Sequence, residues 1–211
     1  MNPSQNLSEL HKKALRRFSR LRDLAVQASQ LPFPESDLLI SYVAIEFQTT
    51  LANFTRAYYL SCILKPVLKS GVLVRCDPSI TTFDGAINAA MKKCKYNVWI
   101  KGGWDRRDEP AWHRPESLIK SSQAINCSHY AQIIAAYSLP VNAFDHITKF
   151  RNFYAHRNDY TVRFAQQVAN HYSISPRQHP TKILVSIAYG RPQPLILDWI
   201  DEVTNVIGFL C

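Results

Sequence analysis

An arginine, an amide and a histidine fall within two helical turns in the segment from Arg151 to Asn158, which reads R-N-F-Y-A-H-R-N. Asn152 and His156 are four residues apart, so on a helix they lie on one face. A guanidinium binds phosphate oxygens, an amide positions a polar group, and an imidazole exchanges protons near neutral pH. Together these side chains could bind and cleave a phosphodiester, and Arg151, Asn152 and His156 are therefore the candidate catalytic residues.

The same segment contains the apolar residues that would anchor such a helix. Four apolar residues recur at spacings of four, three and four, namely Ala143, Ile147, Phe150 and Tyr154. This spacing predicts a helix over residues 141–158 with one buried face. Asn152 lies about 200° around the helix from Phe150, so the face with Asn152 and His156 points away from the buried stripe. Arg151 lies between the two faces. A solvated helix face with incidental charges is the alternative interpretation.

The pattern R-N-x-x-A-H at residues 151–156 resembles the signature of the HEPN superfamily, in which an arginine is usually followed by a polar residue and, after a short spacer, by a histidine. Many members are metal-independent ribonucleases of toxin–antitoxin and anti-phage systems. The resemblance is looser over residues 36–172, where the segment A-I-E-F-Q-T-T-L-A-N-F-T-R-A-Y-Y-L is similar to a helix of uncharacterised bacterial HEPN-like proteins. It implies an all-α, HEPN-like bundle of long antiparallel helices.

The resemblance also implies roles for the candidate residues. Arg151 would bind the scissile phosphate and stabilise its transition-state charge, and His156 would be general base or acid on the ribose 2′-OH and the leaving 5′-oxygen. Asn152 would position one of these groups. The products would be a 2′,3′-cyclic phosphate and a 5′-OH, with no metal or other cofactor. In the family two protomers pair with their motif helices facing each other, so a homodimer is expected.

One regulatory feature of the family is not matched. In one branch a partner nucleotidyltransferase modifies a tyrosine two residues after the histidine. That position is Asn158 here, and Tyr160 lies two residues further on. Inhibition by a separate antitoxin or by a sensor protein remains open.

The pattern along the chain predicts a single domain over residues 1–211. A bundle core over 36–172 would follow a basic N-terminal helix within 1–35 and precede a C-terminal extension over 173–211. Further helices are expected at 7–29, at 37–64 with Ser36 as its N-cap, at 80–95, at 116–137 and after Pro194. Residues 160–172 are expected to continue as a helix or as a bent extension. Residues 182–189 (K-I-L-V-S-I-A-Y) alternate and are rich in β-branched residues, which predicts a lone strand or an extended strap.

A polar stripe accompanies the core seam of the helix predicted over 37–64. It consists of Tyr42, Glu46, Thr49, Asn53 and Arg56. Such a stripe could face solvent, or it could face the histidine helix. We expect the second arrangement, with Glu46, Asn53 and Arg56 supporting the candidate catalytic residues.

The charge balance favours a polyanionic partner. The chain has 25 Lys and Arg against 16 Asp and Glu, a formal net charge of +9, which suits nucleic acid. Residues 95–114 interleave three of the four tryptophans with basic residues. This combination is suited to single-stranded RNA, although a loop pinned by its tryptophans is the alternative. The expected RNA-binding residues are Lys149, Arg157, Lys101, Arg106, Arg107 and Arg114.

Other features set the expected compartment. The five cysteines are an odd number without a C-x-x-C pair, which is typical of reduced thiols in the cytoplasm. Cys94, His113, Cys127 and His129 match no zinc-ligand spacing. The chain begins with a polar segment and contains no run of about 18 apolar residues, so neither a signal peptide nor a membrane span is expected.

These observations favour a cytoplasmic, metal-independent endoribonuclease, a toxin or an anti-phage defence effector by resemblance. The alternative is a non-catalytic HEPN module that binds RNA, a nucleotide or a partner protein, because a fold does not fix a function. A third class, a helical protein that binds DNA or a membrane surface through the basic first helix, lacks a helix-turn-helix spacing in its favour.

Overall fold

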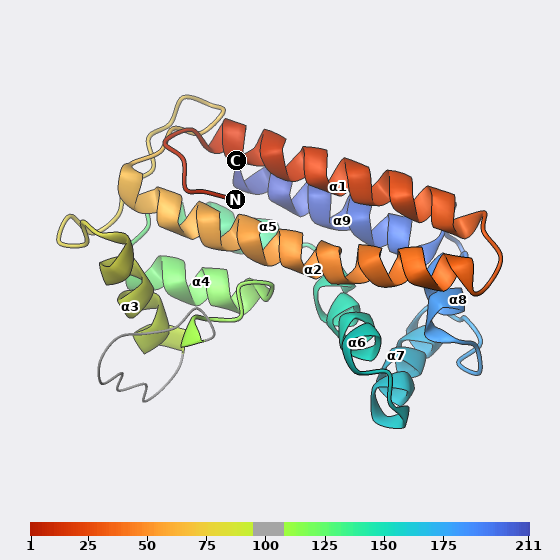
Figure 1. Ribbon diagram of the computed structural model, residues 1–211. Helices are drawn as coiled ribbons and strands as arrows, with labels where there is room; N and C mark the ends of the chain where they lie inside the picture. The colour runs from red at the N-terminus through yellow and green to blue at the C-terminus, as the bar shows by residue number, and fades with distance from the viewer. Residues whose placement is uncertain (95–107) are drawn as a thin grey trace. The chain divides into compact units, whose positions relative to one another are not determined.

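The computed structural model describes residues 1–94 and 108–211 (Figure 1). Within these ranges every regular element is a helix, and strand-like pairing is limited to three isolated bridges. This confirms the predicted all-α class. The elements are α1 (Leu7–Ser29), α2 (Glu35–Ser61), the 3₁₀ helix η1 (Cys62–Leu64), α3 (Phe83–Cys94), α4 (Pro115–Ala124), α5 (Tyr130–Tyr137), α6 (Ala143–His156), α7 (Asp159–His171), α8 (Pro180–Val185) and α9 (Leu195–Leu210).

Most helices lie where the apolar spacing predicts them, although several ends shift by one to three residues. Two of the differences concern the start of α2 and the segment 116–137. The helix α2 begins at Glu35, so Ser36 lies inside it and the prediction of Ser36 as N-cap is wrong. The helix predicted over 116–137 is two helices, because the chain turns between α4 and α5. Asn126 has a left-handed backbone there, with φ 48°, a conformation that asparagine tolerates better than most residues.

The prediction of a strand or strap over 182–189 is wrong for its first part, which lies in the helix α8. Pro180 occupies the first turn of α8, and the His179 side chain accepts a hydrogen bond from the Thr181 amide. Proline is preorganised for this position, whereas a lone strand would have no partner for its backbone. Ile183 and Leu184 are fully buried, so the apolar residues of the pattern pack from a helix.

The described chain divides into two compact units. Unit 1 comprises Met1–Ala14, Leu51–Pro140 and Val206–Cys211, and unit 2 comprises Leu15–Thr50 and Val141–Asn205. Helices α1, α2 and α9 contribute residues to both units. The single-domain organisation and its internal boundaries at 36 and 172 remain predictions.

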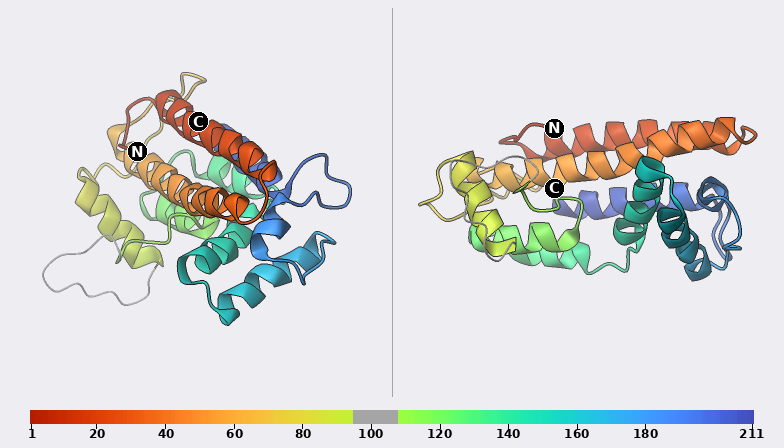
Figure 2. Two further views of the ribbon diagram at one scale, coloured as in Figure 1. Left: turned by 45° about the vertical axis from the view of Figure 1, so that its right-hand side comes forward. Right: turned by 60° about the horizontal axis from the view of Figure 1, so that its bottom comes forward.

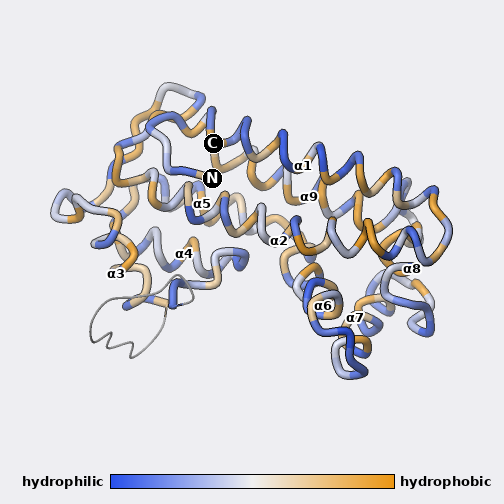
Figure 3. The backbone as a smooth tube through the Cα atoms, in the orientation of Figure 1, coloured by the Kyte–Doolittle hydropathy of each residue, from blue (hydrophilic) through white to orange (hydrophobic). Residues whose placement is uncertain are grey.

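Unit 2 contains the predicted motif, and its core is aromatic. Phe18 of α1 and Phe47 of α2 meet edge to face with their ring centroids 5.5 Å apart. Trp199 of α9 is fully buried and contacts Phe150 of α6 at 5.6 Å between centroids. Figure 2 shows α6 and α7 side by side in both views. Figure 3 shows hydrophilic and hydrophobic residues alternating along α1, as expected for a helix with one buried face.

Candidate functional site

Helix α6 presents the predicted catalytic residues on its exposed side. Its predicted apolar stripe is buried, from Ala143 to Tyr154, while Asn152 and His156 are exposed and Arg151 is partly exposed. The two-faced helix is therefore confirmed. Burial of the stripe fixes the rotation of α6 and with it the direction of the polar face.

Within this face Arg151 turns toward its neighbour. Its Nη1 donates a hydrogen bond of 3.4 Å to Oδ1 of Asn152. No ion pair of Arg151 and no side-chain hydrogen bond or ion pair of His156 occurs in the part of the chain that the structure describes. A free cation, an amide and a free imidazole thus lie at the C-terminal end of one helix. Arg151 and His156 are five residues apart, which separates them by about 140° around the axis.

The next residue, Arg157, has a structural role. It ends α6 in the left-handed conformation with φ 43°, and its Nη1 forms an ion pair of 2.8 Å with Oδ2 of Asp37. The guanidinium also lies over the rings of Phe153 and Tyr154, at 5.8 and 5.6 Å from their centroids. Arg157, an expected RNA contact, is therefore already bound by a carboxylate and two rings.

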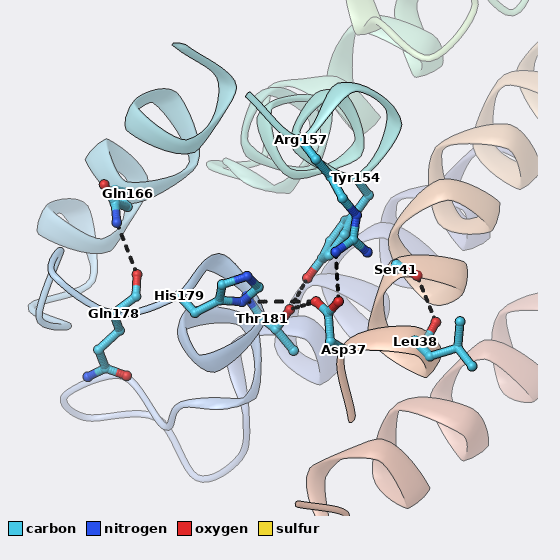
Figure 4. Close-up of polar contacts among 9 residues, drawn as sticks. All are labelled: Asp37, Leu38, Ser41, Tyr154, Arg157, Gln166, Gln178, His179 and Thr181. Atoms are coloured by element: carbon cyan, nitrogen blue, oxygen red, sulfur yellow. Dashed lines mark hydrogen bonds and ion pairs between the residues drawn. The ribbon is translucent and has the colours of Figure 1, made fainter. Parts of the chain in front are cut away.

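Asp37 is the centre of a polar cluster that joins α2, α6 and α8 (Figure 4). The Thr181 hydroxyl donates a hydrogen bond to Oδ1 of Asp37 and shares a further one of 2.9 Å with the Tyr154 hydroxyl. His179 Nδ1 lies 3.9 Å from the same carboxylate oxygen. Burial alone would raise the pKa of Asp37, but the hydrogen bonds from Thr181 and Arg157 outweigh it and hold this pKa below its ordinary value. The ionised carboxylate of Asp37 therefore holds the C-terminal end of α6 through Arg157.

Helix α7 starts directly after Arg157 with a capping box. Asn158 Oδ1 accepts a hydrogen bond of 2.9 Å from the Thr161 amide, and Thr161 Oγ1 accepts one of 3.2 Å from the Asn158 amide. These bonds satisfy backbone donors at the start of the helix. Asn158, two residues after His156, is thus the N-cap of α7. The capped turn also carries Tyr160, which is exposed.

A surface pocket of about 220 Å³ opens between α6 and α7 beside the motif. Its lining residues are Lys149, Asn152, Tyr160, Thr161 and Phe164. The rings of Tyr160 and Phe164 meet edge to face with centroids 4.6 Å apart. Asn152 and Lys149 are predicted site residues, whereas the aromatic pair was not predicted. Its signal in the sequence is the i, i+4 spacing of two aromatic residues.

A second histidine of α6, His146, contacts Tyr172 and Trp199. Its Nδ1 lies 2.9 Å from the Tyr172 hydroxyl, which also accepts a hydrogen bond of 2.9 Å from Trp199 Nε1. Burial lowers the pKa of His146 to about 4, and the nearby charge of Lys149 contributes. His146 is therefore neutral near pH 7 and belongs to the core of unit 2.

The residues expected to support the site divide between the two units. In unit 2 Gln48 of α2 also contacts α6, because its Nε2 donates a hydrogen bond of 2.9 Å to Thr148 Oγ1, while Glu46 is partly exposed. In unit 1 Asn53 is partly exposed, and both guanidinium nitrogens of Arg56 bind the buried carboxylate of Glu109 at 2.6 and 2.8 Å. Arg56 thus has a structural partner, and the supporting role of the three residues remains a prediction.

Most of the basic and aromatic connector lies outside the described residues, including Lys101, Arg106 and Arg107. Arg114 is exposed just before α4. Trp112 is buried, and its Nε1 donates a hydrogen bond of 2.7 Å to Glu109, so a tryptophan anchors this part of the connector.

Over residues 1–94 and 108–211 no cluster of three His, Cys, Asp or Glu side chains could hold a metal ion. In the same ranges no helix combines the length and apolarity of a membrane span.

Comparisons with known proteins do not place the chain in a family. No family model matches it, and neither a curated protein nor a solved structure gives a match.

Proposed function

We propose that this protein is a metal-independent endoribonuclease that cleaves RNA to 2′,3′-cyclic phosphate and 5′-OH ends. The proposal rests on the exposed arginine, amide and histidine at the end of α6, held on a helix whose other face is buried. Arg151 and His156 are free of ion pairs within the described residues, so both are available to a phosphate and a ribose.

In the proposed reaction the chain's own side chains move the protons and stabilise the charge. An imidazole removes the proton of the 2′-OH, the 2′-oxygen bonds to phosphorus, and the P–O5′ bond breaks. A protonated imidazole then donates a proton to the leaving 5′-oxygen. Arg151 neutralises the charge that develops on the phosphate oxygens, and Asn152 holds the Arg151 guanidinium through their hydrogen bond.

The proposed active form is a homodimer. One α6 helix offers a single His156, and its direction differs by about 140° from that of Arg151. A second copy would supply the missing imidazole and place an arginine of one protomer beside a histidine of the other. The resemblance supports the further proposal of a cytoplasmic toxin or defence effector restrained by an antitoxin or a sensor protein.

A second candidate function is RNA or nucleotide binding without cleavage. The same divergence of Arg151 and His156 favours it, because a monomer would have a binding face but no acid and base pair. The two candidates differ in whether RNA ends are produced.

The test is incubation of the pure protein with total RNA and a chelator, followed by analysis of the RNA ends. Arg151→Ala and His156→Ala should each reduce cleavage by about a hundredfold or more while circular dichroism stays unchanged. Arg163→Ala is the matched control, since Arg163 is an exposed arginine of α7. Unchanged cleavage in both motif variants would refute the proposal, as would RNA that binds but is never cut.

A further inference from the structure

The pocket between α6 and α7 has the composition of a nucleobase site. We propose that it binds one unstacked base of a single-stranded RNA, next to the phosphate that Arg151 contacts. This inference rests on the proposed function, because it assigns to the same substrate the place where its base is held.

The apolar wall of the pocket is an exposed aromatic pair. The side chain of Tyr160 is 70% exposed and that of Phe164 is 37% exposed, although most aromatic rings in unit 2 are buried. Because Phe164 meets the Tyr160 ring edge to face, a face of the Tyr160 ring stays open for stacking. Every base has a π face, so such a platform accepts single-stranded RNA of many sequences.

The polar wall supplies one cation and one amide. Lys149 is partly exposed and has no ion pair within the described residues, so its ammonium is available to a phosphate. The amide of Asn152 has two N–H donors, which suit acceptor atoms on the edge of a base. Among the described residues that line the pocket there is no carboxylate, so nothing in the wall repels a polyanion.

Asn152 connects this pocket to the proposed chemistry. Its side chain lines the pocket and also accepts the hydrogen bond from Arg151. A base held against Tyr160 and Asn152 would therefore place the neighbouring phosphate near the Arg151 guanidinium. A base in a duplex is stacked and paired, so it cannot enter this pocket, and the site should select single strands.

The pocket is also preformed. The capping box between Asn158 and Thr161 fixes the first turn of α7, and Thr161 is itself a lining residue. Only Arg157 and Asn158 separate α6 from α7, and Arg157 is held by Asp37. The aromatic wall therefore requires little ordering on binding, which reduces the entropic cost.

The experiment measures binding of the full chain to a short, fluorescent, 2′-O-methylated single strand by anisotropy. This RNA cannot form a cyclic phosphate, so binding is separated from cleavage. Tyr160→Ala should weaken binding about tenfold or more, as for loss of a stacked base, whereas Tyr160→Phe should retain it. Lys149→Ala should weaken binding and reduce the salt dependence by about 0.7 in logarithmic slope. The control is Tyr189→Ala, because Tyr189 is 92% exposed and does not line the pocket.

The outcomes separate this inference from the proposed function. If the wild type cleaves RNA but Tyr160→Ala binds the single strand as tightly as Tyr189→Ala, the base site is refuted and the nuclease stands. If Tyr160→Ala loses binding but the wild type never cleaves, the base site stands and the nuclease fails. If Tyr160→Ala instead changes the oligomeric state in light scattering without changing affinity per protomer, the aromatic pair is a contact between copies and the inference is wrong.

Discussion

Asp37 shows how one side chain can fix a functional helix from a distance in the sequence. It binds Arg157 at the end of α6 and Thr181 in α8, and both partners lie more than a hundred residues away. Only 12% of its side chain is exposed, so its charge is stabilised mainly by these partners. Removing the charge would leave Arg157 without its carboxylate in a left-handed conformation that is itself unfavourable.

We therefore predict that Asp37→Asn destabilises the protein. The expected loss is about 1.5–3 kcal/mol in the free energy of unfolding, the range for hydrogen bonds to a charged group. Urea unfolding followed by circular dichroism measures it. The matched control is Asp23→Asn, which removes an exposed carboxylate of α1 and should change little. Equal stability of the two variants would show that the cluster around Asp37 is not structural.

His146 gives the stability a pH dependence whose sign follows from burial. Its folded pKa is about 4, against an ordinary value of 6.5. The unfolded chain therefore takes up a proton at higher pH than the folded chain does, and the stabilisation is fully present above pH 6.5. It is lost as the pH falls from about 6.5 to about 4.

We predict that the melting temperature falls over this pH range and that His146→Gln makes the profile flatter. Thermal melts between pH 7 and pH 4.5 test it. A variant that retains the full wild-type slope would show that other groups cause the decline. The variant should also be less stable at pH 7, because the Tyr172 hydroxyl loses its contact with the imidazole.

Residue types and spacing were enough to predict the exposed face of α6, because the helical period alone separates Asn152 and His156 from Phe150. They were not enough for the contacts of Asp37. Those contacts depend on which distant elements meet, and nothing in a local window of sequence encodes that. The same limitation explains Arg56, whose partner Glu109 lies in a loop between α3 and α4.

At the scale of elements, the two-residue connection between α6 and α7 decides where the pocket lies. Arg157 ends one helix in a left-handed conformation, and Asn158 begins the next with a reciprocal pair of hydrogen bonds. The presence of an asparagine at position 158 is therefore explained by its role as the N-cap of α7. Its side chain controls the first turn of α7, where Tyr160 is located.

We predict that Asn158→Ala costs about 1 kcal/mol in the free energy of unfolding, the usual effect of removing an N-cap. Asn158→Asp is the matched variant and should retain the stability, because a carboxylate accepts the same bond from the Thr161 amide. Hydrogen exchange at the first turn of α7 should rise in the alanine variant only. Equal exchange in both variants would contradict the role of the cap.

The apolar spacing predicted the long helices well because each buries a stripe with a period of 3.6 residues. It was less informative for short elements. The alternation at 182–189 resembles a strand, yet Pro180 and the His179 cap start a helix there. The turn between α4 and α5 depends on the left-handed backbone of Asn126, which the spacing of apolar residues does not predict.

At the scale of the whole chain, the net charge of +9 suits an RNA partner without indicating which surface binds it. Arg157 and Arg56 are basic residues that the fold uses for ion pairs with Asp37 and Glu109. Lys149 and Arg151 remain free of such pairs within the described residues. The count of charges therefore overstates the cations available at the motif, and the proposed site depends on a few of them.

The last prediction concerns the assembly that cleavage requires. Because Arg151 and His156 diverge on one helix, we expect the active cleft to combine an arginine of one protomer with a histidine of its partner. Mixing the inactive variants Arg151→Ala and His156→Ala under conditions that exchange subunits should then restore part of the cleavage activity. Light scattering should show dimers at micromolar concentration for the wild type and for both variants. A monomer with full activity, or inactive variants whose mixture stays inactive although subunits exchange, would show that the site is not shared between protomers.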